Sequence, residues 1–146
     1  MKVGALEKKK FLRQAFNMYR RLIGRAERIE RLQELTKHVT TIINGVPSGR
    51  PNDKSLMEVS AVEVDEQIMR MAEDTVYFFK VFEEISAVIS VIDDDDERTV
   101  LEYRYLSFQS WKEIAAAMGL SLQHVYRLHS RALDKINIPA AQISAI

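Results

Sequence analysis

The sequence predicts an all-α protein in which a long antiparallel helical hairpin, similar to a coiled coil, precedes a compact three-helix helix-turn-helix domain. The 146-residue chain has only five Gly and three Pro, too few for a fold of many short strands and turns. Apolar residues instead recur at steps of three and four, as on one face of a helix. We expect a hairpin over residues 1–92 with its loop at about 44–54, an acidic linker at 93–96, the helix-turn-helix domain at 97–137 and a tail at 138–146.

The first helix is predicted from about Ala5 to Asn44 and Gly45. Gly and Asn favour helix ends, and the prolines that follow at Pro47 and Pro51 cannot continue a helix. Its apolar stripe comprises Phe11, Ala15, Met18, Leu22, Ile29, Leu32, Val39 and Ile43.

The second helix has a more regular seven-residue repeat, which is typical of a coiled-coil seam. Two capping boxes, Ser55 with Glu58 and Ser60 with Glu63, are alternative starts for this helix. Its seam comprises Met57, Ala61, Val64, Ile68, Met71, Thr75, Phe78, Phe82, Ile85, Ile89 and Ile92.

Charge and aromatic content suggest how the hairpin packs. Residues 1–31 have a net charge of +7 and residues 32–96 of −9, so the basic first helix should lie along the acidic second. A lone hairpin would leave aromatic surface uncovered around Tyr77, Phe78, Phe79 and Phe82. We therefore expect self-association, with a dimer favoured, or docking on a partner.

Composition argues against several classes of protein. The absence of Cys excludes disulfides and thiolate metal sites and is compatible with a reducing compartment. The longest apolar run, residues 85–92, is far below the roughly 20 residues that cross a bilayer. The first ten residues lack the apolar segment of a secretory signal. We expect a cytoplasmic protein without membrane contact.

No arrangement of residues points to catalysis, a metal or a cofactor. Asp93 to Asp96 lack the spaced oxygen ligands of a calcium loop, and these acids instead favour the N-terminus of the next helix. His124 and His129 are five residues apart and cannot chelate one ion from one helix face. No carboxylate pair, phosphate loop or Ser-His pair stands out, so we expect a protein that is not an enzyme.

Three short helices are predicted in the C-terminal part, the first of them over residues 97–106. Ser110 and Glu113 form a capping box for the second, which ends at Met118 and Gly119. Ser121 caps the third, which runs to about Ile136. A small residue at Ala115 and apolar anchors at Val125 and Leu128 complete the spacing typical of a helix-turn-helix.

A helical wheel predicts which face of the third helix is exposed. Val125, Leu128, Ala132 and Ile136 share its buried side, and Gln123, Arg127, Ser130 and Asp134 point away. Arg pairs with guanine and Gln with adenine in the major groove, so Arg127 and Gln123 are candidate base contacts. His124 and Arg131 flank this face on one side and Tyr126 on the other.

The stretches Arg98 to Leu106, Trp111 to Ala115 and Ser121 to Ile136 resemble region 4 of the bacterial sigma-70 factors, which recognises the minus-35 promoter element. The resemblance implies DNA-reading positions at Leu122, Gln123, Tyr126 and Arg127. It also implies that Arg104 and Lys112 match or neighbour phosphate-contact positions. Leu122, His124 and Tyr126 stand where sigma factors usually have charged or Arg residues, so the sigma target sequence does not carry over.

The whole chain is similar to small phage and prophage proteins of Gram-positive bacteria, a resemblance carried by residues 100–115. It implies a regulator of late or packaging genes. We expect a dimeric, sequence-specific regulator of transcription that binds double-stranded DNA, with the hairpin as an arm for oligomerisation or for docking on RNA polymerase. The alternatives are a DNA-packaging component similar to a terminase small subunit, and a module that binds RNA polymerase without reading DNA.

Overall fold

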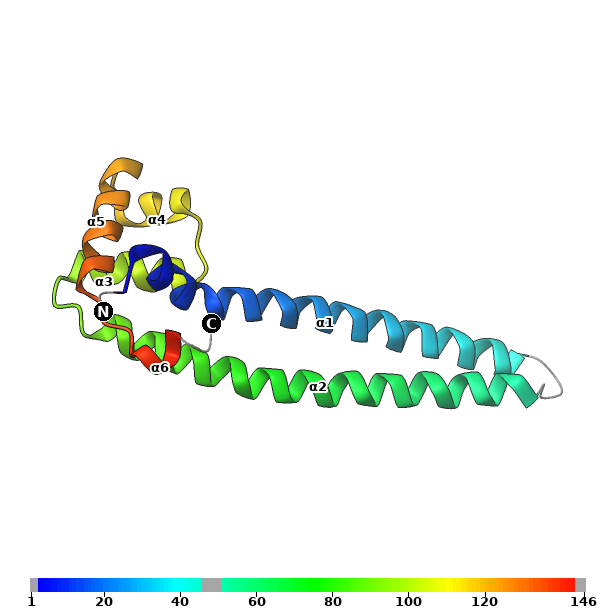
Figure 1. Ribbon diagram of the computed structural model, residues 1–146. Coiled ribbons are helices and arrows are strands. Elements are labelled where there is room, and N and C mark those ends of the chain that lie inside the picture. The colour runs from blue at the N-terminus through cyan, green and yellow to red at the C-terminus, as the bar shows by residue number, and fades with distance from the viewer. Residues whose placement is uncertain (1–2, 46–50, 144–146) are drawn as a thin grey trace. The chain divides into compact units, whose positions relative to one another are not determined.

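The structure is a computed structural model that describes residues 3–45 and 51–143, with side chains described outside residues 39–40 and 42–57. These residues contain helices and no strand, which confirms the predicted all-α class (Figure 1). None of the described helices combines the length and the apolar character needed to span a membrane. The elements are α1 (Ala5–Gly45), α2 (Pro51–Ser90), α3 (Asp95–Leu101), the π-helix η1 (Glu102–Leu106), α4 (Trp111–Met118), α5 (Leu122–Lys135) and α6 (Ala140–Ile143).

The helix α1 has the predicted bounds, whereas α2 begins earlier than either capping box. Ser55 and Ser60 lie inside α2, which starts at Pro51. Proline is favoured at the first helical position because its missing N–H needs no partner there and its φ is already helical. Of the predicted loop, residues 44–45 and 51–54 are therefore helical, and residues 46–50 lie outside the described residues.

The chain divides into two compact units, Met1–Met18 with Phe78–Ile146 and Tyr19–Tyr77. The predicted boundary at residues 93–96 thus lies inside the first unit. In the second unit, Arg25 of α1 pairs with Asp74 of α2, with 2.6 Å between Nη1 and Oδ2. This ion pair agrees with the expectation that the basic helix lies along the acidic one.

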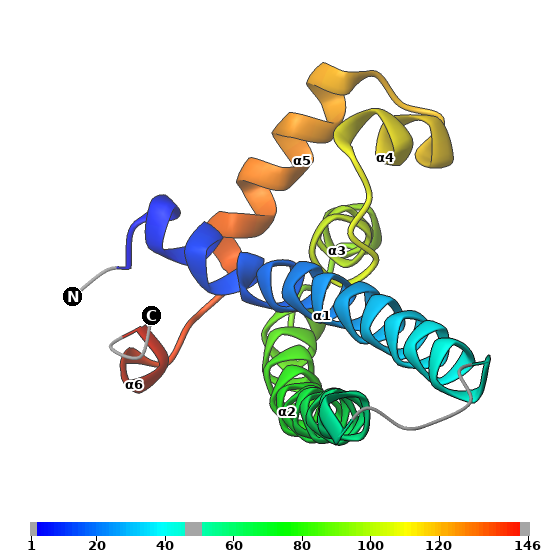
Figure 2. The same ribbon diagram turned by 90° about the vertical axis from the view of Figure 1, so that its right-hand side faces the viewer.

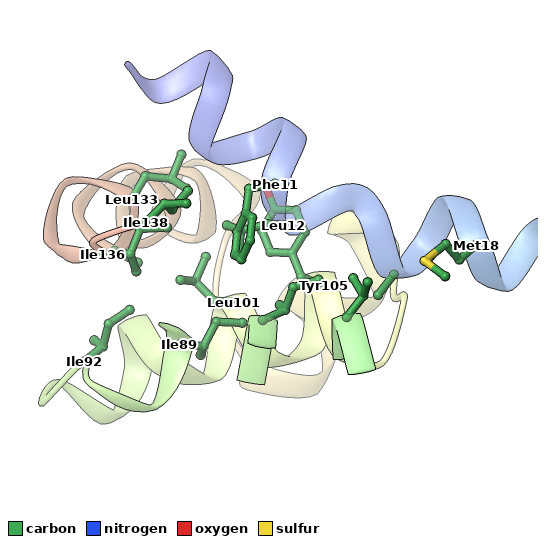
Figure 3. Close-up of a cluster of buried hydrophobic side chains, with 14 residues drawn as sticks. Phe11, Leu12, Met18, Ile89, Ile92, Leu101, Tyr105, Leu133, Ile136 and Ile138 are labelled. Atoms are coloured by element: carbon green, nitrogen blue, oxygen red, sulfur yellow. The ribbon is translucent and has the colours of Figure 1, made fainter. Parts of the chain in front are cut away.

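One apolar core in the first unit joins the N-terminal end of α1 and the C-terminal end of α2 to the helices that follow (Figure 3). Phe78 and Phe82 of the predicted seam pack against this core, whereas Tyr77 and Phe79 are 57% and 58% exposed. Two of the four aromatic residues that we expected to be uncovered are therefore partly buried within the chain. The buried members include Phe11, Leu12, Ile85, Ile89, Leu101, Tyr105, Leu133, Ile136 and Ile138.

The segment expected to be a tail contributes to this core. Ile136 is fully buried in an extended conformation after α5, and Ile138 is also buried. In extended chain, residues two apart point to the same side, so both side chains reach the core. The helix α6 (Ala140–Ile143) follows within this segment.

The acidic run caps α3, as its position in the sequence suggested. Asp94 is the N-cap, and its Oδ1 accepts a hydrogen bond of 2.9 Å from the backbone N–H of Glu97. Asp95 and Asp96 lie in the first turn, where the helix dipole favours negative charge. Glu97 is buried, and its Oε2 lies 2.5 Å from Lys135 Nζ, an ion pair between the two ends of the helix-turn-helix region.

The predicted helix over residues 97–106 is in fact α3 followed by a π-helical turn. The N–H of Ser107 donates to the carbonyl oxygen of Glu102, five residues earlier, at 3.0 Å. The next residue, Phe108, has φ of 58°, an uncommon conformation for a bulky side chain. Its ring packs against the core with its centroid 5.6 Å from that of Phe16, which offsets part of the backbone strain.

Because Leu12 is completely buried in this core, Leu12→Ala should lower the free energy of unfolding by about 2 to 5 kcal/mol. Leu6→Ala is the matched control, since Leu6 lies on the same helix and is 67% exposed, and it should change stability by less than about 0.5 kcal/mol. Urea unfolding monitored by circular dichroism measures both. Equal effects from the two variants would contradict the assigned core.

Candidate nucleic-acid interface

Local backbone signals fix the joint between α4 and α5. The side chain of Ser110 accepts a hydrogen bond from the Glu113 backbone N–H, and Glu113 accepts one in return from the N–H of Ser110, each at 3.2 Å. Gly119 ends α4 with φ of 66°, in the left-handed region that only glycine adopts readily. Ser121 then caps α5 through the N–H of His124. Both caps and the turn were predicted from the sequence and are confirmed.

A second apolar cluster holds the joint together from three helices. Val100 of α3, Ile114 and Ala115 of α4, and Val125 and Leu128 of α5 are all buried in it. In Figure 2, α3 and α4 are both neighbours of α5, and α5 contacts each of them. The small side chain of Ala115 lets α4 and α5 approach closely, as a helix-turn-helix requires.

The face of α5 opposite this cluster is open to solvent. Gln123, Arg127, Ser130 and Asp134 are all exposed, as the wheel predicted. Leu122 and Tyr126 are 36% and 46% exposed on the same helix. Arg131 is exposed and His124 half-buried, so α5 presents six of the eight predicted DNA-contact residues.

The two remaining residues lie on other elements. Lys112 is exposed in the first turn of α4. Arg104 of η1 is half-buried, because its Nη1 donates a 3.1 Å hydrogen bond to the carbonyl oxygen of Gln109 and its guanidinium carbon lies 4.5 Å from the ring centroid of Trp111. Arg104 is thus held beside α4 rather than extended into solvent.

A buried polar pair lies behind the exposed face. Tyr105 Oη and His129 Nε2 share a 2.7 Å hydrogen bond, and the ring centroid of Trp111 lies 4.8 Å from that of His129. The sequence had suggested no role for His129, although it lies about 40° from Val125 on the wheel, on the buried side. Helix periodicity could therefore have placed this histidine in the interior.

The surroundings keep both groups neutral. Burial is the main cause that lowers the pKa of His129 from 6.5 to about 4, and the nearby charges of Lys9 and Arg104 contribute the rest of this shift. Burial raises the pKa of Tyr105 to about 12 against the opposing effect of Arg104 and Arg13. At neutral pH the pair is an uncharged hydrogen bond, and the described residues contain no group of His and carboxylate side chains that could hold a metal ion.

The comparison with known families agrees with this geometry. Residues 94–137 match Sigma-70, region 4. The region 4 segment spans α3 to α5 and leaves out the two long helices. It supports a DNA-binding helix-turn-helix of a regulatory kind, with RNA polymerase contact as a further role of such domains. No curated protein and no solved structure matches the chain.

The pKa of His129 makes the stability of the region 4 segment depend on pH. The unfolded histidine binds a proton below about pH 6.5, whereas the folded one does so only near pH 4. The free energy of unfolding that neutral His129 contributes is therefore fully present above pH 6.5 and is lost as the pH falls toward 4. We expect about 2 kcal/mol less stability at pH 5 than at pH 7.

Urea unfolding of wild type and His129→Leu at both pH values measures this effect. The variant loses the hydrogen bond to Tyr105 but has no group to titrate, so the difference between pH 7 and pH 5 should shrink by the same amount. A difference equal to that of wild type would show that His129 is not the titrating group.

Proposed function

We propose that this protein is a sequence-specific, DNA-binding regulator of transcription of the phage type, in which α5 reads base pairs in the major groove and the long helices form an oligomerisation arm. The observation that carries the proposal is the exposure of Gln123 and Arg127 on a helix whose opposite face is fully buried. A helix held in this way can enter the groove as a rigid body.

The chemistry of the exposed face supports base reading. Arg127 is one turn from Gln123 in the N-terminal half of α5, the part of a recognition helix that contacts base edges. Arginine forms two hydrogen bonds with guanine and glutamine two with adenine, so each residue favours a different base. Leu122 and Tyr126, also exposed here, offer apolar contact with a thymine methyl group.

The charge of the segment supports action as an oligomer. Residues 97–146 have a net charge of only +2, which predicts few phosphate contacts and modest affinity for a single copy. Two linked copies bind adjacent half-sites far more tightly because the second contact becomes intramolecular.

A stripe of exposed apolar residues on α2 supports contact with a second copy of this chain. Val62, Met69 and Val76 are seven residues apart and are 62%, 65% and 72% exposed. A seven-residue apolar repeat is the pattern with which two helices pair in a coiled coil. Ile85 of the predicted seam is buried inside the chain and does not belong to this stripe.

Selection of bound DNA from a random pool at controlled salt tests the proposed function directly, and enrichment of one motif is expected. With that motif, Arg127→Ala should weaken binding by about 1 to 3 kcal/mol and relax the preference at one base position. Lys112→Ala is the comparison, since a phosphate contact would weaken binding to all sequences alike. If the pool yields no enriched DNA, the protein does not read sequence and binding of RNA polymerase alone becomes the better explanation.

Val76→Asp should convert the oligomer to a monomer, because it places a charge in the proposed apolar contact. Val91→Asp is a matched control, since Val91 is 63% exposed and lies outside the stripe. Size-exclusion chromatography with light scattering gives the mass of each variant. A dimeric wild type is expected; a monomer would contradict self-association, and an octamer or larger ring would favour the packaging function.

A further inference from the structure

A cavity of about 390 Å³ lies in the first unit, on the flank of the helix-turn-helix. Three cations line it, Lys9 and Arg13 from the N-terminal part of α1 and Arg104 from η1. None of its eight lining residues is acidic. The basic character of the first helix, including Lys8 to Lys10, had already suggested additional phosphate contacts from the sequence. Lys9 and Arg13 lie outside the region 4 segment.

The positive charge of this cavity is not neutralised within the described part of the chain. There, no carboxylate lies within ion-pair distance of Lys9, Arg13 or Arg104. Arg104 donates a hydrogen bond to the uncharged carbonyl oxygen of Gln109. The lowered pKa of His129 reflects the same field, since Lys9 and Arg104 both contribute to it after burial.

The lining suits a phosphate group. Lysine and arginine are the usual partners of phosphate oxygens, and arginine can bind two of them at once. Tyr126 and Ser130 of α5 add hydroxyl groups to the lining. Such groups are common hydrogen-bond donors to phosphate in protein–DNA complexes.

The position of the cavity indicates where this phosphate comes from. Tyr126 and Ser130 lie on the same side of Arg127 around α5, and Trp111, which also lines the cavity, is the first residue of α4. In a helix-turn-helix the first helix of the motif crosses the DNA backbone. A recognition helix in a groove about 12 Å wide has a phosphate strand on either side. If α5 lies in the major groove, one strand of the DNA backbone therefore runs beside this cavity.

We infer that Lys9 and Arg13 of α1, together with Arg104, bind a backbone phosphate of the DNA that α5 reads. The inference rests on the proposed function and adds to it a third DNA-binding element far from the helix-turn-helix in sequence. It also supplies positive charge that residues 97–146 lack. The first helix then serves both as part of the arm and as part of the interface.

The test uses the full-length protein and the DNA motif from the pool selection. The double variant Lys9→Ala/Arg13→Ala should make the slope of log affinity against log salt shallower by about one to two units and weaken binding about three- to tenfold at 0.15 M salt. Lys10→Ala removes a charge from an exposed neighbour on α1 that does not line the cavity, so it should leave the slope unchanged. Lys9→Arg should retain the wild-type slope.

A second measurement observes the cavity itself. Trp111 is the single Trp of the chain and lines the cavity, so its fluorescence reports binding there. Motif DNA should change this fluorescence in wild type and in Lys10→Ala, and the change should be reduced in the double variant. Thermal melts check that the double variant is folded. Its melting temperature should match that of wild type, because Lys9 and Arg13 are exposed and lie outside both cores.

The outcomes separate this inference from the proposed function. If wild type enriches a DNA motif but the double variant has the slope of Lys10→Ala, the inference fails and the proposed function stands. Titration with inorganic phosphate and with ATP at constant ionic strength tests for a free ligand. Saturable quenching of Trp111 by ATP, with an unchanged DNA slope in the double variant, would assign the cavity to a free nucleotide and overturn its assignment to DNA.

Discussion

The shared apolar core of the first unit is the interaction on which the rest of the structure depends. Leu12 of α1, Ile85 of α2 and Ile136 after α5 are fully buried in one cluster, although they come from three distant parts of the chain. Each fully buried aliphatic side chain contributes about 1.5 to 3 kcal/mol, so a cluster of this size outweighs any single polar contact. The helix-turn-helix therefore shares its core with the adjoining ends of α1 and α2.

This core has a direct consequence for α5, which is anchored along its length. Val125 and Leu128 pack into the cluster shared with α4, and Ala132 and Leu133 pack into the core shared with α1 and α2. Lys8 of α1 adds a 2.7 Å hydrogen bond from its Nζ to the carbonyl oxygen of Leu133. This anchoring leaves one face of α5 exposed and holds Lys9 and Arg13 of α1 beside α5. The same apolar packing that stabilises the helices therefore also positions the residues of the proposed DNA contact.

The helix-turn-helix was predictable because its signals are local. The cap at Ser110, the left-handed turn at Gly119 and the cap at Ser121 each depend on residues within four positions, where the backbone must satisfy its own N–H and C=O groups. The exposed position of Arg127 follows from helix periodicity alone. The start of α2 was less predictable, since Ser55 and Ser60 satisfy the capping pattern as well as true caps do and Pro51 starts the helix instead.

The sequence by itself determined the all-α class, the turn between α4 and α5 and the solvent-facing side of α5, because short-range backbone hydrogen bonding and a 3.6-residue period specify them. Only the tertiary structure decided which polar and charged side chains meet. The hydrogen bond between Tyr105 and His129 joins residues 24 positions apart, and the cavity of Lys9, Arg13 and Arg104 joins the first helix to the last domain. No local pattern encodes such pairs, because they arise from how the buried faces of separate helices fit together.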